Sequence, residues 1–112
     1  MSDRLPSGIL ASGLIRRVHD AGGFAAVRAK GDAGAGAMLL IALARDGSAR
    51  LFERRLGPSG EAAVIDSTPA DASVGAIEDY WRSRRRYDPD LWVIELDVPD
   101  AERFAAETLR ER

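Results

Sequence analysis

The run Ala-Met-Leu-Leu-Ile-Ala-Leu-Ala at residues 37–44, with Arg-Asp-Gly after it at residues 45–47, decides the fold. The run has no polar side chain, and its eight residues are the length of a strand but short for a buried helix. It therefore predicts a strand covered on both faces. Asp46-Gly47 is the strongest short hairpin signal, because a type I′ turn needs a positive φ at both central residues. We expect the partner strand of this hairpin at residues 49–55.

Alternating and helical patterns of apolar residues predict the other elements. We expect further strands at residues 24–30, 62–67 and 91–98, and helices at residues 7–21, 71–86 and 100–109. Ser7, and either Asp71 or Ser73, have side chains suited to capping the first two helices. Strands joined by short turns predict antiparallel pairing, whereas the helix before residues 91–98 indicates a crossover.

The predicted fold class is α+β. The elements predict an antiparallel or mixed sheet of four to five strands, in the order α-β-β-β-(β)-α-β-α. We expect two to three helices to cover this sheet, mainly on one face. In the last strand, Trp92, Ile94 and Leu96 point to one side and Leu91 and Val93 to the other.

The composition limits the classes of protein that remain. The chain has 112 residues, 46% apolar and 30% charged, which predicts one globular domain over residues 1–112 with a flexible N-terminus at residues 1–5. Its net charge of −2 gives no overall attraction to nucleic acid or to an anionic membrane. The absence of cysteine excludes zinc–thiolate sites, and no apolar run reaches the roughly 20 residues that span a bilayer. We expect a soluble, cytoplasmic protein that uses no metal and no cofactor.

Several short motifs resemble those of one bacterial family. They are Leu14-Ile-Arg-Arg-Val18 with Ala21-Gly-Gly-Phe24, Lys30-Gly-Asp32 with Ala35-Gly-Ala37, Asp46-Gly47 with Arg50-Leu51, and Tyr87-Asp-Pro-Asp-Leu-Trp-Val-Ile-Glu95. Over residues 5–97 the chain resembles the family catalogued as domain of unknown function 1491. The most specific motif is Asp-Pro-Asp-Leu-Trp at residues 88–92, after an arginine-rich helix end. The resemblance implies a free-standing, cytoplasmic single domain and no particular activity, because the family has no established one.

The glycine-rich loop at residues 31–36 invites comparison with a phosphate-binding loop. Its glycines at 31, 34 and 36 do not follow the spacing Gly-x-Gly-x-x-Gly, and no Gly-Lys-Ser/Thr closes it. It also leads into a strand, whereas loops that bind anions lead into a helix N-terminus. We therefore expect a hairpin-like connection that pairs the strands on either side of it.

The arginine run at the end of the second helix is the best functional lead. Such a run complements the helix dipole, and its charges can pair with Asp79, Asp88 and Asp90 at a solvated helix end. Combined with nearby aromatic rings, it also suits phosphate, RNA or an acidic partner segment. We predict a non-enzymatic interaction module, with a protein partner or a second copy of the chain more favoured than nucleic acid. The candidate binding residues are Trp81, Arg82, Arg84, Arg85, Arg86, Tyr87 and Trp92.

Carboxylates give the alternative hypothesis, an enzyme that processes nucleic acid or handles phosphate. Asp88 and Asp90 flank a proline and Glu95 lies on the next strand, so together they could hold Mg²⁺. Nuclease cores of similar element order need a Glu-x-Lys, but here residues 53–55 read Glu-Arg-Arg. We favour a turn-forming role for Asp-Pro-Asp. His19, the only histidine, has no nucleophile motif beside it and is expected at the surface.

Overall fold

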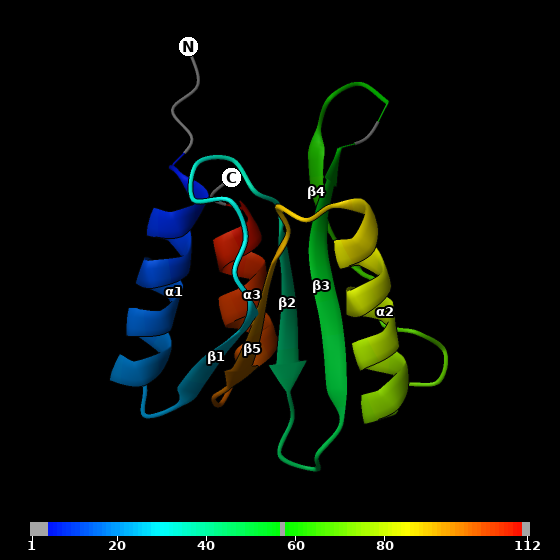
Figure 1. Ribbon diagram of the computed structural model, residues 1–112. Helices are drawn as coiled ribbons and strands as arrows, with labels where there is room; N and C mark the ends of the chain where they lie inside the picture. The colour runs from blue at the N-terminus through cyan, green and yellow to red at the C-terminus, as the bar shows by residue number, and fades with distance from the viewer. Residues whose placement is uncertain (1–4, 57, 111–112) are drawn as a thin grey trace.

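In the computed structural model, which describes residues 5–56 and 58–110, three helices and five strands follow one another in the predicted order (Figure 1). The elements are α1 (Ser7–Asp20), β1 (Phe24–Ala29), β2 (Met38–Leu43), β3 (Ala49–Leu56), β4 (Ala62–Asp66), α2 (Val74–Tyr87), β5 (Trp92–Asp97) and α3 (Ala101–Arg110). The expected flexible segment at residues 1–5 lies outside the described residues, except for Leu5. Within the described ranges, no helix combines the length and apolar character needed to cross a membrane.

The five strands form one mixed sheet in the order β1-β5-β2-β3-β4, with β2 in the centre. The pairs β2–β3 and β3–β4 are antiparallel, as the short connections predict. β5 lies between β1 and β2, antiparallel to the first and parallel to the second. The expected pairing of β1 with β2 is therefore wrong. Val93 and Ile94 of β5 are fully buried on opposite faces, beneath α2 and beneath α1 and α3. A strand buried in this way also needs partners for the backbone hydrogen bonds at both of its edges, and β1 and β2 provide them.

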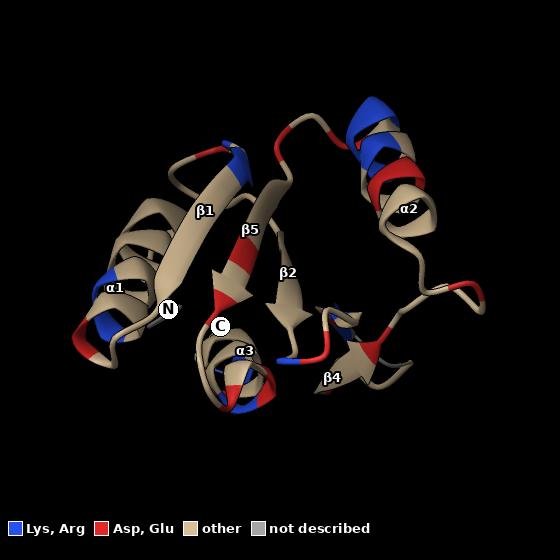
Figure 2. Cartoon of the chain, turned by 90° about the horizontal axis from the view of Figure 1, so that it is seen from below, with Lys and Arg blue, Asp and Glu red and all other residues tan. Residues whose placement is uncertain are grey.

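Helices cover both faces of the sheet, two on one side and one on the other (Figure 2). Toward α1 and α3, β2 presents Met38, Leu40 and Ala42, and toward α2 it presents Leu39 and Ile41. β5 follows its predicted alternation, with its even-numbered apolar residues toward α1 and α3. The expectation that the helices would gather mainly on one face describes α1 and α3 but not α2.

Ser7 does not cap α1, contrary to the prediction. Its side chain is fully buried, and its hydroxyl donates a hydrogen bond of 2.6 Å to the carbonyl oxygen of Gly36. The backbone N–H groups of Ser7 and Gly8 donate to the carbonyl oxygens of Gly34 and Ala33, at 3.1 and 2.8 Å. The glycine-rich loop therefore supplies acceptors to the helix N-terminus. These amides, which a phosphate would need, are already bonded to the loop.

Candidate interaction surface

One side of α2 packs on the sheet and the other faces solvent. The helix begins with Ser73, whose hydroxyl accepts a hydrogen bond of 3.2 Å from the N–H of Ala76, as expected for an N-cap. Ile77 and Trp81 are buried, one turn apart, whereas Asp79 and other residues across the helix are exposed. The four arginines at residues 82–86 therefore point in different directions around the helix, and each must be considered separately.

Arg84 points toward the sheet and forms an ion pair with Glu53 of β3, whose side chain is only 4% exposed. The hydroxyl of Tyr80 donates a second hydrogen bond to the same carboxylate, at 2.6 Å. Burial by itself would raise the pKa of Glu53, but the bonds from Tyr80 and Arg84 outweigh it and lower that pKa. The same ion pair raises the pKa of Arg84 despite the burial that opposes it. Arg84 thus fastens α2 to β3.

The sequence analysis did not single out Glu53 as the partner of the arginine run. A signal for it exists in the alternation of β3, where Ala49, Leu51 and Glu53 share one face. Since the first two are apolar and buried, the third lies at a position that predicts burial. A carboxylate at such a position needs a cation, and the arginine run of α2, the helix that covers this face of the sheet, supplies it.

Arg85 points toward the turn that follows α2. Its guanidinium lies near three backbone carbonyl oxygens, at 2.5 Å from Pro89, 2.9 Å from Leu91 and 3.2 Å from Lys30. These contacts join the end of α2, the turn and the end of β1. The arginine therefore holds the Asp-Pro-Asp turn in place and offers little to a partner.

Trp92 lies inside the protein, at the place where the turn meets the glycine-rich loop. It is 6% exposed, and its indole N–H donates a hydrogen bond of 2.8 Å to the carbonyl oxygen of Asp32. The N–H of Asp32 in turn donates to the carbonyl oxygen of Asp90, at 3.0 Å. A Cβ atom at either Gly31 or Gly36 would lie 2.2 Å from that same oxygen, so only glycine fits there. Two of the motifs that carry the family resemblance, at residues 30–37 and 88–92, thus meet in one contact.

Trp81 is buried beneath two guanidinium groups. Arg82 and Arg28 lie over its ring, 5.0 and 5.5 Å from the centroid, as cation–π contacts. Glu78 accepts from both, at 2.6 Å from Arg28 and 3.3 Å from Arg82, and Arg28 also pairs with Glu95 at 3.1 Å. The hydrogen bond from Arg28 lowers the pKa of Glu78. Arg82 is therefore held in one orientation while remaining exposed.

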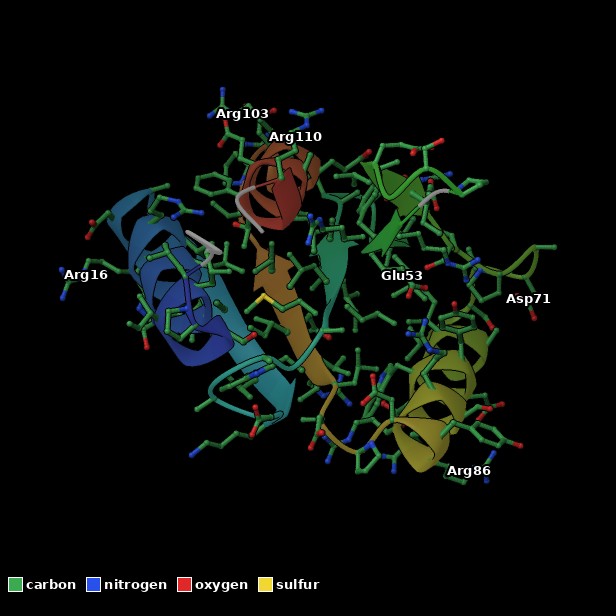
Figure 3. The ribbon with its side chains drawn as sticks, turned by 90° about the horizontal axis from the view of Figure 1, so that it is seen from above. Arg16, Glu53, Asp71, Arg86, Arg103 and Arg110 are labelled. Carbon is green, nitrogen blue, oxygen red and sulfur yellow. The ribbon has the colours of Figure 1, made fainter. Side chains whose placement is uncertain are left out.

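Arg86 lies at the C-terminal end of α2 (Figure 3), and Tyr87 is the last residue of this helix. Tyr87 is 89% exposed, the highest value among the large apolar and aromatic side chains of the described residues. Arg86 is also exposed, and in the described part of the chain it makes no ion pair. Of the seven candidate binding residues, these two and Arg82 remain on the surface. We call these three residues the α2 surface.

The carboxylates of the alternative hypothesis lie in separate local structures. Asp88 accepts a hydrogen bond of 3.2 Å from the N–H of Asp90, which closes the turn, and Glu95 pairs with Arg28 further along β5. Over residues 5–56 and 58–110, no three histidine or acidic side chains come together as metal ligands could. His19 is exposed and lies edge-on to Phe24, with 6.3 Å between ring centroids.

A groove of about 950 Å³ opens at the other end of the sheet, where α3 begins. None of the candidate binding residues lines it. Its charged lining residues are balanced in sign, with Arg45, Arg50 and Arg103 against Asp97, Asp100 and Glu102. This balance favours neither an anionic nor a cationic ligand.

A model of one protein family, described as "Protein of unknown function (DUF1491)", matches residues 5–106. The chain belongs to the DUF1491 family. The match continues past residue 97, where the resemblance was expected to end, and includes the first half of α3. Among curated proteins, none matches the chain.

Three solved structures share the fold. An NMR structure of a DUF1491 family protein from Caulobacter crescentus CB15 is 36% identical, with a TM-score of 0.79, over 92% of this chain and 94% of that one. A crystal structure of a DUF1491 family protein from the same organism is 37% identical, with a TM-score of 0.78, over 89% and 94%. A solution structure of a protein from A. tumefaciens is 36% identical, with a TM-score of 0.68, over 83% and 85%.

Proposed function

We propose that this DUF1491 protein is a non-enzymatic interaction module of the cytoplasm, and that the α2 surface binds an acidic segment of a partner protein. The observation that carries the proposal is the side chain of Tyr87, 89% exposed beside the free guanidinium of Arg86. Tyrosine and arginine are the residue types most often found at the energetic centre of protein interfaces. Single exposed apolar side chains are common, so it is the combination of an exposed tyrosine with exposed arginines on one helix end that favours a role in binding.

The support for this surface is rigid. Beneath it, Glu53 holds Arg84, and three backbone carbonyls surround Arg85, so the end of α2 has little freedom to move. Arg82 is oriented by Trp81 and Glu78. A surface that is ordered before binding loses less conformational entropy when a partner arrives.

The charges favour an acidic protein segment over nucleic acid. The α2 surface has two guanidinium groups, and Glu78 already neutralises part of the charge of Arg82. The whole chain carries a net charge of −2, whereas nucleic-acid-binding domains usually present a strongly basic face. Two arginines and a tyrosine match the side chains of a short glutamate-rich or aspartate-rich peptide.

The test is calorimetric titration with a polyglutamate peptide at several salt concentrations. We compare the wild type with the triple variant Arg82→Ala/Arg86→Ala/Tyr87→Ala, and expect the variant to bind at least about tenfold more weakly. The double variant Arg16→Ala/Arg110→Ala is the matched control, because it removes exposed arginines from α1 and α3 (Figure 3). We expect this control to bind as the wild type does.

Two outcomes would contradict the proposal. One is a wild type that does not bind the peptide at low salt, or a triple variant that binds it equally well. The other is a single-stranded RNA oligomer that binds more tightly than the peptide and shows the same loss in the triple variant. The second result would make the α2 surface a phosphate-binding one.

A further inference from the structure

The two outer strands of the sheet differ in how well their free edges are protected. β4 has five residues and ends at Asp66, whose carboxylate forms an ion pair of 2.6 Å with Arg50. β1 has six residues, Phe-Ala-Ala-Val-Arg-Ala, with Arg28 as its only charge. Proteins protect such edges with charges, because an unpaired strand edge can pair with another chain. β1 has one other such device, an irregularity in its ladder between Val27 and Ala29, and residues 24–27 before it carry no charge.

The apolar residues of β1 are open to solvent. Phe24 is 74% exposed and Val27 44%, and Ala26 between them is also exposed. Arg28 does not protect the edge, because its guanidinium turns toward α2 and β5 to pair with Glu78 and Glu95. The segment from residue 24 to residue 27 is thus an uncharged, exposed strand edge made of two large and two small side chains.

We propose that β1 pairs with β1 of a second copy of this chain, antiparallel, to form one continuous ten-stranded sheet in a two-fold symmetric dimer. Symmetry and the faces of the sheet restrict the register. Ala25 pairs with Leu96 and packs on the core beneath α1 and α3, whereas Ala26 pairs with Glu95 on the face of α2. Directly opposite residues in an antiparallel pair share a face of the sheet. One residue must therefore lie opposite its own copy, with the two-fold axis midway between the two.

Ala26 is the residue that centres the pair on the exposed part of β1. With the axis at Ala26, Ala25 lies opposite Val27 of the partner subunit, on one face. On the other face Phe24 lies at the end of the pairing, because the irregularity in β1 between Val27 and Ala29 interrupts the regular ladder. The two Ala26 side chains meet at the axis, and their methyl groups are too small to hold the two strands apart. In this register no two bulky side chains and no two like charges of residues 24–27 lie opposite each other, which favours a second copy over an unrelated strand.

This inference is independent of the α2 surface, since the two use different elements and different residues. A six-residue edge buries much less area than the interfaces of stable dimers, so the dimer should be weak and its population should depend on concentration. The proposed function can fail while this dimer is found, and the reverse is equally possible.

Sedimentation equilibrium of the full chain over a wide range of concentrations tests the dimer. Ala26→Lys and Ala26→Glu each place two like charges on the two-fold axis, so each variant alone should remain monomeric. An equal mixture of the two places opposite charges there and should restore a dimer that contains one of each. Ala63→Lys, at an exposed position of the other outer strand, is the matched control and should dimerise as the wild type does.

The expected pattern is therefore a dimer for the wild type, the Ala63→Lys control and the mixture, and monomers for the two separate Ala26 variants. Thermal unfolding of each variant distinguishes loss of pairing from loss of the fold, because Ala26 is exposed and both variants should remain folded. Ala26→Glu should melt somewhat lower than Ala26→Lys, since residue 26 lies opposite Glu95. A wild type that stays monomeric at every concentration overturns the proposal. So does a mixture that remains monomeric although both variants are folded.

Discussion

Arg84 and Arg86 lie two residues apart on α2 and have opposite roles. Arg84 forms a largely buried ion pair with Glu53, whereas Arg86 is exposed and outside all of the ion pairs of the described residues. The helical period turns one toward the sheet and the other toward solvent. The comparison teaches that a run of identical charges in a sequence is not one site, and that the partner of each charge decides its role.

The largest loss of stability is expected when Glu53, the buried partner of Arg84, is removed. Glu53→Ala leaves Arg84 partly buried without its carboxylate, and Tyr80 without its acceptor. We expect the free energy of unfolding to fall by about 3 kcal/mol or more. Urea unfolding measures this change. Glu53→Gln keeps the shape and one acceptor for Tyr80, and should lose less.

The next effect concerns the contact between the glycine-rich loop and the turn that Arg85 holds. In Gly36→Ala the new Cβ atom would lie 2.2 Å from the carbonyl oxygen of Asp90, so the loop must move. We expect a loss of about 2 kcal/mol in the free energy of unfolding. Gly75→Ala on α2 is the matched control, because nothing lies within 4 Å of the new atom. It should be neutral or raise stability by about 0.5–1 kcal/mol. Equal losses in the two variants would contradict the proposed contact.

A smaller effect is expected from pH, again through Glu53. Its pKa is lower in the folded protein than in the unfolded chain, where glutamate titrates at about 4.3. Its contribution to stability is therefore complete above that value and is lost as the pH falls through the folded pKa. Unfolding measured between neutral and acidic pH should show a decline that is shallower in Glu53→Gln. Identical profiles for the two proteins would show that Glu53 does not titrate with folding.

The sequence predicted the element order because periodic apolar residues and turn residues are local signals. The apolar run at residues 37–44 became the central strand, and Asp46-Gly47 lies in the turn after it. Only Gly47 has a positive φ, so the expected type I′ turn is wrong, and the connection is a longer turn that ends at this glycine. The insertion of β5 between β1 and β2 could not be read in this way. It depends on a pairing between segments about half the chain apart, and short connections predict only the pairing of neighbours.

The sequence predicted which arginines lie together on α2, but not the direction in which each side chain points. The sequence placed Arg82, Arg84, Arg85 and Arg86 on one helix, yet whether each reaches a carboxylate, a carbonyl or solvent depends on what the sheet presents beneath it. Trp92, one of the candidate binding residues, is buried, as its alternation with Ile94 indicates.

The most direct measurement is the pair of variants Arg84→Ala and Arg86→Ala, each studied by urea unfolding and by titration with the polyglutamate peptide. The account predicts that Arg84→Ala loses about 3 kcal/mol of unfolding free energy, while Arg86→Ala stays within about 0.5 kcal/mol of the wild type. It also predicts that Arg86→Ala binds the peptide more weakly. If Arg84→Ala proved as stable as the wild type, or if Arg86→Ala bound the peptide equally well, the division of the run into an inner and an outer half would be contradicted.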